Sequence, residues 1–168
     1  KYIIDNYRSN IDDKHLEIGP GTGYFLKKEN LGMDFNKLTL VDVNSKILDY
    51  SKKNLLSDYP CVDVISYDLF NNKISSCVEF NSVGINYVLH CVPGNLQTKL
   101  DKLIYNLGDK KYNIFGASVI CDPLHMNPIA EYELMFLNAF GIFHNSGDTY
   151  EELNEYLIKR DLKFSLEK

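Results

Sequence analysis

The chain has 168 residues, of which 45% are hydrophobic and 24% charged, and its formal net charge at pH 7 is -5. This length predicts one domain with a buried core, and the composition is typical of a globular protein. The negative charge argues against a nucleic-acid partner, and no apolar stretch reaches the roughly 18 residues that span a bilayer. We therefore expect a single domain over residues 1–168, with neither nucleic acid nor a membrane as its partner.

Strand-like segments alternate with amphipathic segments along the chain. The strand-like segments, rich in apolar or β-branched residues, are 15–18, 38–43, 61–67, 82–91, 113–120 and the start of a sixth at 162–166. The segments that favour helix are 2–10, 22–28, 45–56, 95–107, 128–140 and 149–159. Asn44 and Asp148 are the expected N-caps, and Gly108 is an expected helix stop.

This alternation predicts an α/β fold. Strands separated by helices form a mostly parallel sheet with helices on both faces. In such doubly wound sheets, ligands bind beyond the carboxyl ends of the strands. Residues that follow the predicted strands are therefore the first candidates for a binding site.

The stretch HLEIGPGTGYFL, residues 15–26, places Gly19, Gly21 and Gly23 directly after the first predicted strand. Glycine allows a sharp turn and a close approach of a ligand to the main chain, and the amides at the start of the next helix can donate to it. The alternative is a tight strand-to-helix turn that binds nothing. A glycine-rich loop alone is a weak signal, so the positions after the other strands decide.

Acidic residues end the next two strands. Asp42 lies 19 positions after Gly23, where an acid is placed to bind ribose hydroxyls. Asp68, in SYDLF, can accept a hydrogen bond from an adenine amino group. Each acid alone could be a turn residue or a helix cap. Together with the glycine loop they predict a ligand that contains a nucleoside.

The spacing of the loop distinguishes two nucleotide ligands. A dinucleotide fingerprint requires G-x-G-x-x-G, but the position three after Gly21 is Tyr24. Glu17, ahead of the first glycine, would repel a pyrophosphate but suits the ammonium and sulfonium of S-adenosylmethionine. The spacing therefore favours S-adenosylmethionine over NAD.

The motifs LEIGPGTGYFL, LTLVDVN and SYDLF resemble those of the class I S-adenosylmethionine-dependent methyltransferases, and the match covers nearly the whole chain. The segments SVGINYVLHCVPGNLQTK and GIFHNSGDTYEELNEYL resemble small bacterial type-12-like methyltransferases. The resemblance implies a Rossmann-like doubly wound sheet that ends in an antiparallel hairpin. Here we expect the last strand to be missing and the domain to be truncated at both ends.

The resemblance also implies a role for positions that follow four of the strands. It assigns the methionine part of the cofactor to Glu17, Gly19, Gly21 and Gly23, the ribose to Asp42 and Val43, the adenine to Asp68 and Leu69, and the surroundings of the sulfonium to Asn86 and Tyr87.

Methyl transfer is an in-line displacement in which the protein mainly positions the reactants. A general base is needed only if the nucleophile must lose a proton. His90 is the first candidate for this base. The segment around it loosely resembles plant O-methyltransferases, in which a histidine near this place acts as a base. The alternative is a structural histidine whose ring forms hydrogen bonds with the backbone. His125 is the second candidate, and no metal-ligand spacing is visible.

The acceptor is predicted only as a class. Residues 126–143 are apolar and mostly suit a helix that packs on the sheet, although a minority could line a pocket for a small, partly apolar or aromatic acceptor. The N/D-P-P-Y type signature of base-modifying enzymes is absent after Asn86. We predict methyl transfer to a small molecule. Two alternatives stay open: a non-catalytic methyltransferase-like module or hetero-oligomer subunit, and a nucleotide-dependent oxidoreductase.

The cysteines predict a reducing compartment. None of the four forms a C-x-x-C pair, and each lies in or beside an apolar segment: Cys61, Cys77, Cys91 and Cys121. The sequence shows no signal-peptide pattern. We therefore expect buried, reduced thiols in a cytoplasmic protein.

Overall fold

The structure is a computed structural model that describes residues 2–122, 126–161 and 163–166. Its chain divides into two compact units. The first unit comprises residues 1–88 and 103–117, and the second comprises residues 89–102 and 118–168. The single domain predicted over residues 1–168 stays a prediction.

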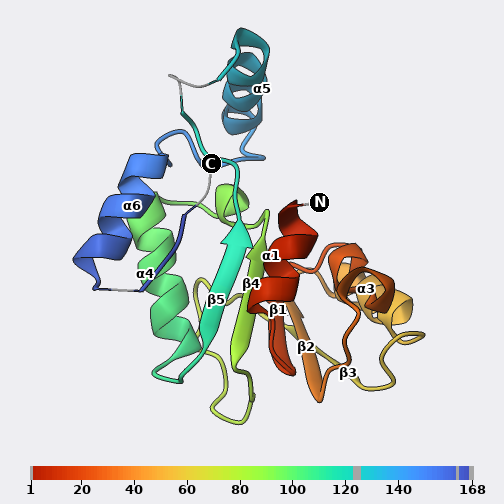
Figure 1. Cartoon of the computed structure of the whole chain (residues 1–168). Helices are drawn as coiled ribbons and strands as arrows, with labels where there is room; N and C mark the ends of the chain where they lie inside the picture. The colour runs from red at the N-terminus through yellow and green to blue at the C-terminus, as the bar shows by residue number, and fades with distance from the viewer. Residues whose placement is uncertain (1, 123–125, 162, 167–168) are drawn as a thin grey trace. The chain divides into compact units, whose positions relative to one another are not determined.

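The first unit contains a five-stranded sheet in the order β3-β2-β1-β4-β5 (Figure 1). Its strands are β1 (Lys14–Ile18), β2 (Lys37–Asp42), β3 (Val62–Ser66), β4 (Ser82–Asn86) and β5 (Asn113–Ala117). All four neighbouring pairs are parallel. The strand order changes direction between β1 and β4, because β2 and β3 extend the sheet on one side of β1 and β4 and β5 on the other. That position is the switch point at which doubly wound sheets bind ligands.

Alternate side chains of the strands are buried on both faces of this sheet, as a doubly wound fold requires. One face packs against α1 (Tyr2–Asn10), α2 (Lys28–Leu31) and α3 (Ser45–Leu55), with Leu38 and Leu40 of β2 in its core. On the other face Leu16, Val41 and Val83 are buried as well. The predicted fold class is confirmed.

The second unit is built from helices and loops. It contains the short 3₁₀ turn η2 (Leu89–Cys91), the first turns of α4 (Leu96–Leu107), α5 (Pro128–Ala139) and α6 (Tyr150–Lys159). Its interior is unusually polar: Lys99, Asn145 and Asp148 are all buried. Most of its apolar residues on α5 are exposed, Leu134 being the buried exception.

Several predicted boundaries are corrected by the structure. Strand β4 ends at Asn86 rather than at residue 91, because Tyr87 has a positive φ of 57° that leaves the extended conformation. The predicted helix over residues 22–28 is a 3₁₀ turn, η1 (Tyr24–Leu26), followed by the short α2. Residues 163–166 form no strand.

The helix caps are partly as predicted. Asn44 caps α3, since its side-chain oxygen accepts from the backbone N–H of Lys46 and Ile47. The predicted cap of α6 was wrong: Thr149 accepts from the N–H of Glu152, whereas Asp148 is engaged in a buried ion pair. Gly108 ends α4 with a φ of 80°.

The expectation of buried thiols was also wrong. Cys61, Cys77 and Cys91 are exposed, and Cys121 is half-buried. All four are free thiols. Among the helices that the structure describes, none has the length and apolar character needed to cross a membrane.

Candidate active site

The parallel register brings the predicted cofactor-binding residues of the first unit to one edge of its sheet. Ile18 lies opposite both Val41 and Ile85, so β1, β2 and β4 end at the same level. The N–H of Gly19 donates to the carbonyl of Val41 over 2.8 Å, and the N–H of Tyr67 donates to the carbonyl of Asp42 over 2.9 Å. Residues that follow these strands therefore share the carboxyl edge of the sheet.

The glycine loop has the conformation that its three glycines allow. Gly19, Gly21 and Gly23 have φ values of 65°, 55° and 77°, in the left-handed region that other residues rarely adopt. A Cβ on Gly19 would lie 2.4 Å from Cγ2 of Val88, so a side chain there would clash with the segment after β4. A Cβ on Gly21 would meet no atom within 4 Å. The main chain is therefore open at Gly21, where a ligand could approach it.

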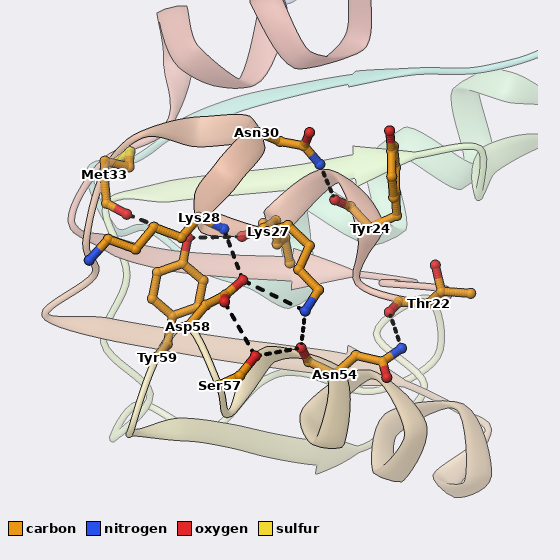
Figure 2. Close-up of polar contacts among 11 residues, drawn as sticks. Thr22, Tyr24, Lys27, Lys28, Asn30, Met33, Asn54, Ser57, Asp58 and Tyr59 are labelled. Carbon is orange, nitrogen blue, oxygen red and sulfur yellow. Dashed lines mark hydrogen bonds and ion pairs between the residues drawn. The ribbon is translucent and has the colours of Figure 1, made fainter.

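Helix α3 holds the loop from one side (Figure 2). The side-chain amide of Asn54 donates to the carbonyl of Thr22 over 3.1 Å, and the hydroxyl of Ser51 donates to the carbonyl of Gly21. Lys27, after the loop, donates to the carbonyl of Asn54 and lies 3.7 Å from the carboxylate of Asp58. Ser51 and Asn54 thus satisfy two carbonyls of the loop, and these bonds hold the loop in place without a ligand.

Asp42 ends β2, and only one of its two carboxylate oxygens accepts a hydrogen bond from the described residues. Its Oδ1 accepts from the N–H of Asn44 over 2.8 Å, whereas Oδ2 accepts no hydrogen bond from the residues that the structure describes. The neighbouring Val43 is exposed, with 68% of its surface accessible. The carboxylate oxygen of Asp42 could accept a hydrogen bond from a ribose hydroxyl, and the exposed Val43 side chain could pack against the flat base attached to that ribose.

Asp68 and Leu69 follow β3 in a rigid turn. The Asp68 carboxylate accepts from the N–H of Phe70 over 2.9 Å and from the side-chain amide of Asn71 over 2.6 Å. Leu69 is buried, and its carbonyl accepts from the side-chain amide of Asn106 over 2.8 Å. Each Asp68 oxygen still has a lone pair for an adenine amino group. Leu69, in contrast, offers no exposed side chain.

Asn86 and Thr39 are the two described residues with buried polar side-chain atoms that lack a hydrogen-bond partner, and Asn86 is the one at the carboxyl edge of the sheet. It is only 6% exposed, and among the residues that the structure describes neither its amide nitrogen nor its amide oxygen has a partner with hydrogen-bond geometry. The nearby hydroxyl of Tyr7 interacts with the amide only enough to oppose the rise of the Tyr7 pKa. An unsatisfied buried polar group costs about 1–3 kcal/mol. The next residue, Tyr87, adopts a positive φ and donates its N–H to the carbonyl of Ala117 over 2.7 Å. A strained turn beside an unsatisfied amide is typical of a ligand site.

Glu17 does not point out of the sheet. Its Oε1 accepts from the phenol of Tyr7 on α1 over 2.5 Å, and its Oε2 lies 2.9 Å from Nε2 of His15. A Cβ on Gly84 of the neighbouring strand would lie 2.1 Å from Oε2, so the glycine makes room for the carboxylate. The assignment of Glu17 to the methionine part stays a prediction. The contacts observed are with the protein itself, behind the glycine loop.

The sequence did not identify the partners of Glu17. His15 is fully buried, and its Nδ1 lies 2.9 Å from the hydroxyl oxygen of Ser82. Burial, then the charge of Glu17 and the hydrogen bond to it, raises the pKa of Tyr7 far above its usual range. Tyr7 therefore stays protonated and donates to Glu17. The only signal in the sequence was the position of a tyrosine on the apolar side of the first helix.

His90 lies in the second unit, at η2. Its Nδ1 accepts from the N–H of Val119 over 3.3 Å, and its ring packs edge-on against Phe143 with a centroid distance of 4.3 Å. Burial and, second, the charge of Lys99 lower the pKa of His90, while Asp148 opposes the change. The neutral ring is favoured, and because Nδ1 is an acceptor, its proton lies on Nε2. In this tautomer the protonated Nε2 can act as a hydrogen-bond donor but cannot accept a proton.

A buried ion pair supports this part of the second unit. Nζ of Lys99 lies 2.6 Å from a carboxylate oxygen of Asp148 and donates to the carbonyl of His144 over 2.6 Å. The N–H of His144 donates to the carbonyl of His90 over 2.6 Å. The other predicted catalytic residue, His125, lies outside the described residues. In the described part of the chain, no group of three or more His, Cys, Asp or Glu side chains could hold a metal ion.

Comparison with known proteins decides the family. No protein-family model matches the chain. The demethylluteothin O-methyltransferase of Streptomyces thioluteus is 30% identical over 162 residues, which cover 95% of this chain and 70% of that enzyme. The chain belongs to the class I S-adenosylmethionine-dependent methyltransferases. The N-methyltransferase vrtF of Penicillium aethiopicum is 26% identical over 182 residues, which cover 99% of this methyltransferase and 68% of the fungal protein.

A solved structure shows the same fold. The plantazolicin methyltransferase BpumL, in complex with a triazolic desmethylPZN analog and SAH, matches this methyltransferase with a TM-score of 0.57 at 18% identity. The match covers 87% of this chain and 54% of the other, so the chain spans about half the length of that enzyme. The predicted fold, family and cofactor, S-adenosylmethionine, are confirmed.

The residues at the carboxyl edge fit this cofactor. Asn86 offers an unsatisfied buried amide, Gly21 an open stretch of main chain, and Asp42 an uncommitted carboxylate oxygen. These groups match a ligand that carries both hydrogen-bond donors and acceptors and has a positive charge. A pyrophosphate would add negative charge beside Asp42, which is unfavourable.

Proposed function

We propose that this methyltransferase binds S-adenosylmethionine at the carboxyl edge of its sheet and transfers the methyl group to a small-molecule acceptor. The observation that carries the proposal is the Asn86 amide at the switch point of the sheet, which is buried and has no hydrogen-bond partner in the described part of the chain. The curated relatives add support, since those compared are named as an O-methyltransferase and an N-methyltransferase.

In this proposal each group at the edge has a separate role. Glu17 and the main chain at Gly19, Gly21 and Gly23 hold the methionine part, the glycines by direct approach and Glu17 by its charge. Asp42 and Val43 receive the ribose, Asp68 and Leu69 the adenine, and Asn86 with Tyr87 the region around the sulfonium. Glu17 also contributes negative charge under the loop, which favours a cationic ligand.

The bound cofactor supplies a methyl group that is already activated by the positive sulfur. A lone pair of the acceptor forms the new bond to the methyl carbon, and the electron pair of the broken carbon–sulfur bond stays on sulfur. A proton of the acceptor then passes to water or to a side chain. The contribution of the protein is orientation and exclusion of water, which can supply several kcal/mol of the barrier reduction.

The proposed catalytic role of His90 depends on its ring proton. The N–H of Val119 occupies Nδ1, so a proton-accepting role at Nε2 would require the ring to change its tautomer. Positioning through the donor Nε2–H and through the fixed ring is the role that the hydrogen bond supports better. His125 remains the second proposed catalytic residue. We also propose a cytoplasmic location, since four free thiols suit a reducing compartment.

Calorimetric titration with S-adenosylmethionine and, separately, NAD tests the proposal on the chain and on its Asn86→Leu variant. We expect binding of S-adenosylmethionine only. Asn86→Leu removes an unsatisfied polar group, so it should raise the free energy of unfolding by about 1–3 kcal/mol and weaken cofactor binding by roughly tenfold or more. Binding of NAD alone contradicts the proposal, and unchanged affinity in the variant removes Asn86 from the site. Cofactor binding without turnover on any acceptor would favour a non-catalytic module.

A second variant tests the ribose position. Asp42→Ala should weaken binding of S-adenosylmethionine by about 1–3 kcal/mol, because it removes a charged hydrogen-bond acceptor. Asp63→Ala is the matched control, since Asp63 is an exposed carboxylate on the neighbouring strand away from the edge. Equal affinities of the two variants would show that Asp42 does not bind the ribose.

A further inference from the structure

The second unit contains an apolar hollow that the assignments above do not use. It has a volume of about 280 Å³ and lies between the segment after β5, α5 and the loop that follows α5. Its walls include Val119, Ala130, Leu137 and Phe143, and among the lining residues that the structure describes Glu133 is the charged one. Ligand pockets in proteins begin at about this size and are mostly apolar with a few polar groups.

Buried hydrogen bonds hold the walls of the hollow in place. The Asn145 side chain is fully buried; its nitrogen donates to the carbonyl of Val119 over 2.8 Å, and its oxygen accepts from Asn138 of α5 over 2.9 Å. The backbone N–H of Asn145 donates back to the side-chain oxygen of Asn138 over 3.0 Å. One asparagine therefore joins the segment after β5, α5 and the loop that follows α5. This buried hydrogen-bond network fixes the positions of the walls, so the hollow has a defined shape.

Two residues of the wall also contact His90. The N–H of Val119 donates to Nδ1 of its imidazole, and Phe143 packs against its ring. The hollow therefore lies next to the proposed catalytic histidine within the same unit. An acceptor in the hollow would share Val119 and Phe143 as neighbours with the imidazole.

The chemistry of the lining limits what the hollow can bind. Apolar walls favour apolar surface by about 25 cal/mol per Å² removed from water. The volume matches roughly ten non-hydrogen atoms at the ~30 Å³ that each water molecule occupies in the liquid. Glu133 is exposed at the rim, so it repels an anion weakly and attracts a cation weakly.

We propose that this hollow is the acceptor site and that the acceptor is an apolar compound of one or two rings, on which any charge is positive. The proposal deepens the function proposed above and rests on it. The acceptor's ring would lie against Leu137 and Phe143, and a basic nitrogen, where present, would face Glu133.

Three probes of the same shape test the proposal on the full chain: 2-naphthol, 2-naphthylmethylamine and 2-naphthoate. Their dissociation constants are measured by calorimetry in the absence of cofactor, and the binding of S-adenosylmethionine is measured separately. We expect the neutral and the cationic probe to bind, and the anionic probe to bind at least threefold more weakly than the cationic one. Equal affinity for all three, or preference for the anion, overturns the proposal.

Two pairs of variants locate the binding. Ala130→Phe fills the hollow and should weaken the neutral probe at least tenfold, whereas Met135→Phe changes the same helix at an exposed position outside the lining and should not. Glu133→Gln should remove the difference between cation and anion, whereas Glu131→Gln should leave it unchanged. Because Glu133 is exposed, this second pair stays informative even if Ala130→Phe fails to fold.

The outcomes separate the two proposals. If Ala130→Phe and Glu133→Gln leave the probe affinities unchanged, the hollow is not the acceptor site, even when the chain binds S-adenosylmethionine. Failure of the chain to bind S-adenosylmethionine while the probes bind as expected overturns the proposed function and, with it, the role of the hollow as an acceptor site.

Discussion

Each of the two units buries an ionisable group, and they stabilise it in different ways. In the first unit, Glu17 is held by hydrogen bonds from Tyr7 and by His15, two positions away on the same strand. In the second unit, Lys99 is held by the opposite charge of Asp148, 49 positions away, and by the carbonyl of His144. When one of two hydrogen-bond partners of a buried carboxylate is removed, the other partner still stabilises it. When one member of a buried ion pair is removed, the other member keeps a charge that no opposite charge compensates. The two arrangements should therefore respond differently to single substitutions.

The largest effect is expected at Lys99. Lys99→Met leaves the Asp148 carboxylate buried without its counter-charge, which should lower the free energy of unfolding by about 3–5 kcal/mol. Urea denaturation measures the change, and Lys102→Met, at an exposed position one helical turn away, is the control. Adding Asp148→Leu to Lys99→Met should recover part of the loss. A single variant as stable as the control would show that the pair is not buried in solution.

A smaller loss is expected at Tyr7. Tyr7→Phe keeps the buried ring and removes one donor to Glu17, so it should cost about 1.5–3 kcal/mol, the range for hydrogen bonds to charged groups. Tyr2→Phe, on the same helix but 85% exposed, should change nothing measurable. Chemical denaturation of both variants checks this. If Tyr7→Phe lowers the free energy of unfolding as much as Lys99→Met does, a hydrogen-bonded buried carboxylate is as sensitive to substitution as a buried ion pair, which contradicts the proposed difference between the two units.

The smallest effect is a pH dependence that comes from His90. The pKa of His90 in the folded chain lies below its usual 6.5, because burial and then the charge of Lys99 disfavour the cation. The unfolded chain therefore binds more protons as the pH falls below about 6.5, and stability is lost towards the lower folded pKa. His90→Gln should flatten this part of the profile. Denaturation between pH 7.5 and 5 on both proteins measures it, and parallel profiles would contradict the lowered pKa.

Sequence reasoning worked best where a local pattern has one structural meaning. The glycines at every second position predicted a sharp turn after the first strand, and all three have positive φ values. Asn44 before an amphipathic run predicted an N-cap, which the structure shows. Asp42 and Asp68 were placed at strand ends by the alternation of elements alone. Each of these predictions uses residues that lie within a few positions of one another in the sequence.

Reasoning failed where a residue had two plausible local roles. Asp148 stands where an N-cap belongs, but its pairing with Lys99 leaves the capping to Thr149. The apolar run after Ser82 has the composition of a long strand, but the chain turns at Tyr87. The exposed thiols were misplaced because cysteine in an apolar segment is more often buried. Tertiary contacts, which no short window contains, decided each case.

The sequence by itself determined the strand-helix alternation, the glycine loop and the acids that follow the strands, because these features depend on local backbone preferences and on the order of elements. Only the tertiary structure decided that Glu17 contacts Tyr7 and His15, that Lys99 pairs with Asp148 and that His90 accepts at Nδ1. It also decided that the Asn86 amide is buried with no hydrogen-bond partner among the residues described. The physical reason is that burial and hydrogen-bond partners are properties of segments brought together by folding.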